Sequence, residues 1–247
     1  MITPGVCLTF DDLYVENWLA ARPIFQAHDA RATFCVCWMH AATPAQIDGL
    51  HQLQEDGHEI AYHGRNHEKL QPYLRQHGLD HWLENEIARG VAEHRALGFP
   101  TTSYASPFYG SNRQTRAATA PYFQITRAGS GRDLSVEDVP KRIYQRPDPD
   151  GAVSSIGLID FQNPGSRSWR EIGAALDMLV AHRGVGIFNG HDIRPRRAGP
   201  GRYSAHRQID RLLREITDRG LAFHTLSGFA RAAQADQEAP QCLPASR

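Results

Sequence analysis

Short apolar runs alternate with longer segments of helical periodicity along almost the whole chain. Runs rich in β-branched and aromatic residues predict strands at residues 6–10, 32–38, 58–62, 103–105, 123–126, 153–159, 184–189 and 222–226. Apolar residues at helical spacing predict helices at residues 15–28, 44–56, 83–97, 114–120, 168–182 and 204–219. This alternation favours parallel βαβ units, which either close as a barrel or form an open, doubly wound sheet.

The pattern gives no sign of a second domain. The 247 residues contain no repeat of fixed period and no linker-like stretch, so we expect one domain over residues 1–233. Barrels built from alternating strands and helices commonly have this length. Residues 194–202, rich in Pro, Gly and Arg, are expected to form a loop, and residues 234–247 a poorly ordered polar tail.

Composition excludes several classes of protein. The 27 Lys and Arg residues balance the 27 Asp and Glu residues, which leaves no net charge to attract nucleic acid or an anionic membrane. No apolar stretch is long enough to span a bilayer, and the N-terminus lacks the features of a leader peptide. The cysteines, at positions 7, 35, 37 and 242, form no metal-binding pair and are expected to be reduced. We therefore expect a cytoplasmic protein.

Two adjacent carboxylates, Asp11 and Asp12, follow the first predicted strand. The alternative to a functional role is a helix N-cap. A second candidate pair is His63 and His67, whose four-residue spacing after the third strand lets both imidazoles reach one metal ion. The alternative is chance, since the chain has 13 histidines and a second pair at the same spacing.

Two further segments follow predicted strands. Residues 104–110, which include Pro107, Phe108 and Tyr109, have backbone amides that could face a ligand, although a plain turn is the alternative. His191 follows the strand at residues 184–189, where a lone histidine is often structural. All four candidates stand at strand ends that converge on one face of a parallel barrel. One carboxylate and two imidazoles would fill three coordination positions of a metal ion and leave others free for water and substrate. The remaining carboxylate and histidine can then transfer protons.

These motifs resemble the polysaccharide deacetylase family, also known as the NodB homology domain or carbohydrate esterase family 4. The resemblance runs from Thr9 to about Phe229. It rests on Thr9-Phe10-Asp11-Asp12, on His63-Gly64-Arg65-Asn66-His67-Glu68-Lys69-Leu70, and on the strand that ends in Gly190-His191-Asp192. The resemblance implies an α/β fold, a distorted (β/α)7 barrel.

The resemblance also implies roles for individual residues. Asp12, His63 and His67 would bind a divalent metal, most often zinc, with cobalt, nickel or manganese as alternatives. Asp11 would be the general base and His191 the general acid. Pro107, Phe108 and Tyr109 would contact the substrate, and a backbone N–H near Phe108 or Tyr109 would hold the oxyanion. Asp160 and Phe161 would stand where the family has an Asp-Trp pair that lines the acetyl pocket.

The chain departs from the family pattern in the third motif, at residues 105–110. The family has an arginine there that pairs with the catalytic Asp, whereas this chain has Ala105 and one additional residue. Arg65, Arg113 and Arg127 are candidates to replace its charge. The alternative is that all three are solvated surface residues. Other departures are Leu13, where Gly is usual, and Gly64, where Ser or Thr is usual.

We therefore expect a metal-dependent hydrolase of a non-peptide C–N amide bond, most simply an N-deacetylase of an acetamido sugar. The substrate would be a small molecule or an oligosaccharide, and the protein could form a homo-oligomer. One alternative is hydrolysis of a non-sugar amide such as a cyclic imide, ureide or formamide. Another is a metal-holding binding module without catalysis, although binding alone needs neither Asp11 nor His191.

Overall fold

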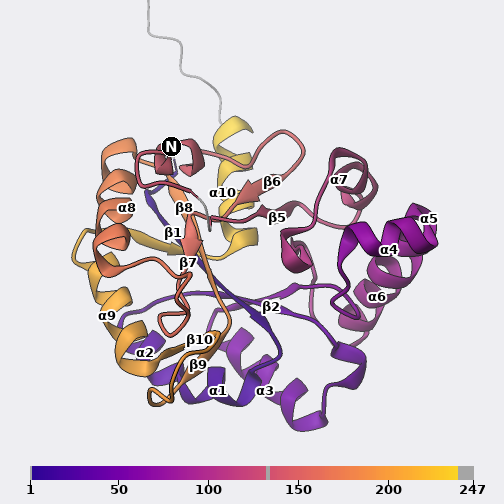
Figure 1. Ribbon diagram of the computed structural model, residues 1–247, viewed down its shortest axis with the longest axis horizontal. Coiled ribbons are helices and arrows are strands. Elements are labelled where there is room, and N and C mark those ends of the chain that lie inside the picture. Colours follow the sequence, from indigo (N-terminus) through magenta and orange to yellow (C-terminus); the bar gives the residue numbers. More distant parts are fainter. Residues whose placement is uncertain (1, 132–133, 239–247) are drawn as a thin grey trace, which may run out of the picture.

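A curved sheet of parallel strands forms the centre of the molecule in the computed structural model, which describes residues 2–131 and 134–238 (Figure 1). Within these residues the sheet has nine strands. They are β1 (Gly5–Asp12), β2 (Thr33–Val36), β3 (Glu59–Tyr62), β4 (Ser103–Ala105), β5 (Ile125–Gly129), β6 (Ala152–Ser154), β7 (Gly157–Leu158), β8 (Val185–Gly190) and β11 (Ala222–His224). A small second sheet pairs β9 (Asp192–Arg194) with β10 (Tyr203–Ala205).

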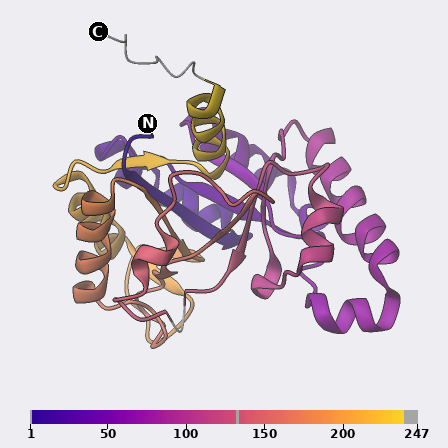
Figure 2. The same ribbon diagram turned by 90° about the horizontal axis from the view of Figure 1, so that it is seen from above.

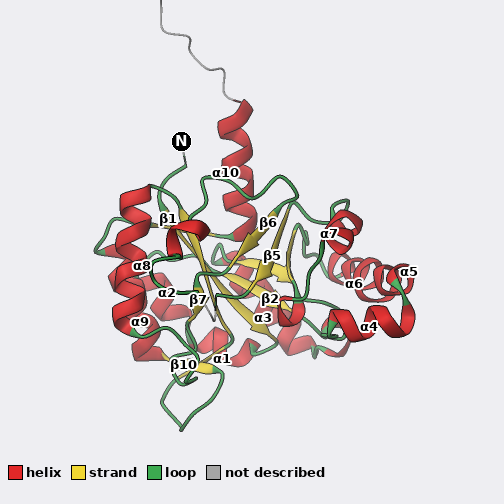
Figure 3. Ribbon diagram, turned by 45° about the horizontal axis from the view of Figure 1, so that its top comes forward, coloured by secondary structure: helices red, strands yellow, loops and turns green. Residues whose placement is uncertain are grey.

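The sheet curls into an incomplete barrel. Its strand order is β6-β5-β4-β3-β2-β1-β8-β7, and β11 joins beside the first half of β1. The two ends of this order, β6 and β7, are separated by residues 155 and 156 alone, so the chain holds the two sheet edges close together. Figure 3 shows the strands gathered at the centre with helices around them. The prediction of a distorted parallel barrel is confirmed.

Helices follow most strands and cover the outside of the barrel. They are α1 (Val15–Ala20), α2 (Arg22–Ala27), α3 (Pro44–Glu55), α4 (Leu70–His77), α5 (Leu79–Trp82), α6 (Arg89–Ala96), α7 (Arg113–Thr119), α8 (Trp169–His182), α9 (His206–Thr217) and α10 (Leu226–Glu238). A π-helical segment, Leu83–Ala88, joins α5 to α6. Figures 1 and 2 both place the purple helices of residues 70–96 and the orange helices α8 and α9 at opposite ends of the molecule.

Several predicted elements differ from those observed. The helix expected at residues 15–28 breaks at Ala21, because the Pro23 ring cannot be accommodated in the interior of one continuous helix. The strand expected at residues 153–159 is two strands, β6 and β7, at opposite ends of the sheet order. Helices α4 and α5 were not predicted. The tail expected from residue 234 begins instead as the end of α10, and residues 239–247 lie outside the described residues.

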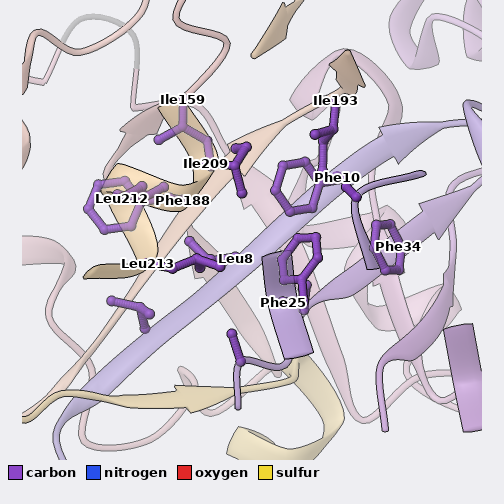
Figure 4. Close-up of a cluster of buried hydrophobic side chains, with 14 of the residues drawn as sticks. Leu8, Phe10, Phe25, Phe34, Ile159, Phe188, Ile193, Ile209, Leu212 and Leu213 are labelled. Atoms are coloured by element: carbon purple, nitrogen blue, oxygen red, sulfur yellow. The ribbon is translucent and has the colours of Figure 1, made fainter. Parts of the chain in front are cut away.

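The main hydrophobic core lies between the sheet and helices α1–α3, α8 and α9. Figure 4 shows Phe10, Phe25 and Phe34 side by side there, and the ring centroids of Phe10 and Phe34 are 5.8 Å apart. Because side chains alternate along a strand, burying Phe10 on this side turns Asp11 toward the barrel interior. The core thereby sets the direction of the first candidate catalytic side chain.

Two sequence-based expectations concern features outside the core. Cys7, Cys35 and Cys37 are buried free thiols, as expected, while Cys242 lies outside the described residues. In the part of the chain that the structure describes, no helix combines the length and apolar character needed to cross a membrane.

Candidate active site

The candidate residues meet at the carboxyl edge of the barrel. Asp11 and Asp12 end β1, His63 follows β3, and His191 follows β8, and all of these strands point the same way. A cavity of about 250 Å³ opens between them. The residues that line it are Asp11, His63, His67, Ser106, Phe108, Tyr109, Leu158, Asn163, His191 and Arg202.

Asp12, His63 and His67 form a cluster with the dimensions of a metal site. One ligand atom from each residue lies within 4.8 Å of the others. The Oδ1 atom of Asp12 is 3.8 Å from Nε2 of His63 and 3.5 Å from Nε2 of His67. This Oδ1 atom is buried and has no hydrogen-bond partner among the described residues. A buried carboxylate oxygen without a donor is costly, so the cluster fits a cation between these three side chains.

The protonation of His63 also suits a metal ligand. Its Nδ1 lies 2.6 Å from the carbonyl oxygen of Ala105, so Nδ1 carries the proton and donates it. Nε2 is then left with a free lone pair that faces Asp12. Burial lowers the pKa of His63 to about 4, and burial also lowers the pKa of His67. Both rings are therefore neutral near pH 7, the form that binds metal.

The backbone of the site is strained at the ligands. Asp12 has φ of 83° and His67 has φ of 57°, in the left-handed region that ordinary residues avoid. Gly64 has φ of 83°, and a Cβ atom there would lie 3.0 Å from Cγ of Pro107. Both the backbone conformation and the close approach of Pro107 favour glycine at the residue after His63.

Arg127 supplies the positive charge that the third motif lacks. Its Nη2 lies 2.7 Å from both carboxylate oxygens of Asp11, and both side chains are buried. Burial acts to raise the pKa of Asp11, but Arg127, His63 and His191 together lower it to about 2. Asp11 is therefore ionised near neutral pH. The contact identifies Arg127 as the replacement and excludes the alternative that all three candidate arginines are solvated.

The other two candidate arginines do not reach Asp11. The guanidinium of Arg65 pairs with Glu93, with its Nε 3.0 Å from the carboxylate. Arg113 is exposed at the start of α7.

Arg127 reaches Asp11 across the barrel. Its strand, β5, is four places from β1 in the sheet order, which in a flat sheet would separate the two strands by about 19 Å. The curvature of the sheet brings them together. Three small buried residues, Cys35, Ala61 and Ala105, form a cluster of their own within the barrel. Ala105 is the register partner of Arg127, so the alanine leaves room where the family arginine would stand.

His191 is oriented by Asp160. The Nδ1 atom of His191 lies 2.5 Å from one carboxylate oxygen of Asp160, and the backbone N–H of His191 donates to the other at 2.8 Å. Asp160 is 1% exposed and lies behind His191 rather than lining the cavity, where it was expected. It fixes the proton on Nδ1 if the ring is neutral and stabilises the ring when it is charged.

Phe161 also lies away from the cavity. Its ring stacks on Trp169 with centroids 4.3 Å apart. Pro107 is buried beneath Gly64, whereas Phe108 and Tyr109 line the cavity. The backbone N–H of Tyr109 already donates to Ser106 at 3.0 Å. The N–H of Phe108 makes no hydrogen bond within the described chain, so Phe108 is the better candidate for an oxyanion donor.

Leu158, Asn163 and Arg202 line the cavity but were not predicted, and Trp38 contacts the site from outside this lining. Arg202 extends from the loop before β10 and contacts Nε2 of His191 through its guanidinium, which is 3.9 Å from Asp12. The sequence signal that could have indicated Arg202 is the group of arginines that begins shortly after His191. Trp38, which is 37% exposed, packs against His67 with ring centroids 5.4 Å apart. Nothing local in the sequence distinguishes Trp38 from a buried strand residue.

The fold and sequence match known proteins of one kind. A protein from Mycobacterium smegmatis assigned to the polysaccharide deacetylases superposes with a TM-score of 0.65 at 17% identity, over 99% of this chain and 95% of that one. A family 4 carbohydrate esterase from Streptomyces lividans superposes with a TM-score of 0.55 at 19% identity, over 90% of this chain and 92% of that one. No curated protein matches the chain in sequence.

A third similar structure is the catalytic domain of a peptidoglycan N-acetylglucosamine deacetylase from Eubacterium rectale, with a TM-score of 0.54 at 15% identity over 91% of this chain and 89% of that one. These three structures share the fold of this chain. The family profile described as polysaccharide deacetylase matches residues 3–125. The chain belongs to the polysaccharide deacetylase family.

Proposed function

We propose that the protein is a metal-dependent hydrolase that removes the acetyl group from an N-acetylated sugar. The observation that carries this proposal is the buried, unpartnered oxygen of Asp12, which faces two neutral imidazoles. Asp11 and His191 line the same cavity. Mere metal storage would need neither of them.

One carboxylate and two histidines form a donor set typical of catalytic zinc, and we propose zinc as the metal. A divalent ion held there would polarise the amide carbonyl and lower the pKa of a bound water molecule. Asp12, His63 and His67 would hold the ion. Cobalt, nickel and manganese accept similar donors and are the alternatives to test.

The remaining steps belong to side chains of this chain. Asp11, kept ionised by Arg127, accepts a proton from the attacking water. The N–H of Phe108 donates to the oxygen of the former carbonyl group. His191, held by Asp160 through Nδ1, donates a proton from Nε2 to the departing amine after the substrate displaces Arg202 from that atom.

Two aromatic side chains support a saccharide substrate. Trp38 and Phe108 pack against the His67 ring, and 51% of Phe108 is exposed to solvent at the cavity. Exposed aromatic rings beside a polar cavity suit the apolar faces of sugar rings. The similar structure from Eubacterium rectale is described as an N-acetylglucosamine deacetylase, which supports the same class of substrate.

The test of the proposal is acetate release from an N-acetylated oligosaccharide by protein loaded with zinc or cobalt. Cyclic imides and formamides run in parallel as the non-sugar alternative. Turnover of these compounds without turnover of any N-acetyl sugar would overturn the sugar assignment. Metal binding without turnover of any compound would favour a binding module.

The first prediction concerns the metal site. The protein is expected to bind one divalent ion per chain, and His67→Ala is expected to lose it, because two ligands hold zinc far more weakly than three. Metal content after dialysis, measured by mass spectrometry, checks this. His81→Ala is the matched control, since His81 lies outside the site but belongs to the second histidine pair at the same spacing. Full metal occupancy with retained activity in His67→Ala would refute the site.

The second prediction concerns His191. His191→Ala is expected to lower turnover of an N-acetyl sugar on the order of 10²-fold, because an amine must be protonated as it leaves. An aryl acetate has a good leaving group and should lose much less. Comparing both substrates under saturating metal checks this, and equal losses would show that His191 has a structural or binding role.

A further inference from the structure

A second cavity is larger than the first, and four of its eight lining residues are arginines. It encloses about 530 Å³ between the starts of α8 and α9 and the loop before β10. The residues that line it are Trp169, Pro195, Arg196, Arg197, Ala205, Arg207, Gln208 and Arg211. This arginine cavity contains no carboxylate in its lining, although the whole chain has equal numbers of acidic and basic residues.

The charges of this cavity are poorly compensated by the protein. Within residues 2–131 and 134–238, the guanidinium groups of Arg196, Arg197 and Arg207 have no carboxylate within 4.0 Å. Arg211 has Glu215 at 3.6 Å, too far for a hydrogen bond. By contrast, Arg214 on the same helix pairs with Asp210 at 2.7 Å. Positive charge therefore accumulates at one concave place on a neutral protein, where it attracts anions.

One arginine of the cavity is held in position. The Trp169 ring stacks on Phe161, and the guanidinium of Arg211 lies 4.1 Å from the centre of the same ring. Both cannot occupy one face of the indole, so Trp169 lies between them. Stacking uses the flat face of a guanidinium and leaves its N–H donors free at the edge. The indole is covered on both faces, so anion contacts rather than ring stacking must supply the affinity here.

Two segments link the lining of the arginine cavity to that of the catalytic cavity. Asn163 lines the catalytic cavity, and the neighbouring Gln162 donates to Gln208, which lines the arginine cavity, at 2.9 Å. The loop that contributes Arg196 and Arg197 continues to Arg202 beside His191. A saccharide that occupies both cavities would pass over these two segments.

We propose that the arginine cavity binds the anionic group of an acidic saccharide whose N-acetyl residue occupies the catalytic cavity. This inference rests on the proposed function. Carboxylate and phosphate oxygens share the geometry that guanidinium groups recognise, so a uronic acid or a sugar phosphate supplies the required chemistry. Arg202 extends the positive charge to the edge of the catalytic cavity.

The test is isothermal titration of the zinc-loaded full chain with saccharides matched in length. A hyaluronan tetrasaccharide supplies carboxylates and is compared with neutral chitotetraose. N,N′-diacetylchitobiose 6-phosphate supplies a phosphate and is compared with N,N′-diacetylchitobiose. We expect at least one anionic saccharide to bind about tenfold more tightly than its neutral counterpart, with an affinity that falls as salt rises. The arm that shows the preference identifies the anion.

Variants locate the binding. Arg207→Gln with Arg211→Gln is expected to abolish the anionic preference and leave the neutral affinity unchanged. Arg214→Gln, on the same helix but outside the cavity, is the control and should keep the preference. No preference in either arm, or a preference unaffected by the double variant, would overturn the inference.

Acetate release is measured in parallel and separates the two proposals. An arginine-dependent preference without acetate release from any saccharide would support this inference and refute the proposed function. Acetate release from chitotetraose with no anionic preference would do the reverse.

Discussion

Asp11→Asn is expected to lower turnover of an N-acetylated sugar about 10²- to 10⁴-fold while the metal stays bound, as for the loss of a general base. The amide of the variant could not accept the proton from water, whereas Asp12, His63 and His67 would be unchanged. Acetate release at saturating metal, together with metal content, checks this. Turnover near the wild-type value, or loss of the metal, would contradict the assignment of Asp11 as the base.

A second variant separates chemistry from folding. Asp11→Asn leaves the buried Arg127 without its counter-charge, which costs about 3–5 kcal/mol of stability in typical buried pairs. In Asp11→Asn/Arg127→Met both charges are gone, so much of that stability should return while turnover stays low. Urea unfolding of the two variants measures the difference. Equal stability of both variants would show that the ion pair is not coupled in folding.

Arg127→Met is expected to shift the pH dependence of catalysis. Arg127 lowers the pKa of Asp11, so its removal raises that pKa. The base acts in its ionised form, and activity falls as the pH drops through its pKa. The acid limb of kcat/KM should therefore move to higher pH, and pH–rate profiles of the folded variant check this.

Moving the charge provides the control for this shift. In Ala105→Arg/Arg127→Ala, the arginine stands on the register partner one strand closer to β1, at the position usual in the family. The acid limb should return toward its wild-type position. A limb that moves in neither variant would mean that this charge does not tune Asp11.

Local signals in the sequence predicted much of the fold. Helix α3 begins after Thr43, whose side chain and Gln46 form the reciprocal hydrogen bonds of a capping box, and Pro44 is its first residue. Strands β1, β2 and β3 lie close to their predicted positions, because each is a short run of buried residues. The residues at their ends meet, because parallel strands bring their carboxyl ends to one edge.

The missed features depend on distant parts of the chain. Three arginines could have balanced Asp11, and only the curvature of the sheet and the small side chain of Ala105 select Arg127. Asp160 was expected in the acetyl pocket, but the position of His191 after β8 makes it a hydrogen-bond partner instead. The split between β6 and β7 follows from their partners β5 and β8, which a sequence pattern cannot show.

The pairing of β1 has a consequence for synthesis of the protein on the ribosome. Residues Gly5 to Phe10 hydrogen-bond to β8, and Gly5 to Cys7 also pair with β11, near the end of the described chain. β1 precedes both partners along the chain, so one of its long edges is unpaired until β8 and β11 have been synthesised. An unpaired apolar edge favours association between chains. Folding of β1 into the barrel therefore has to wait for β8 and β11.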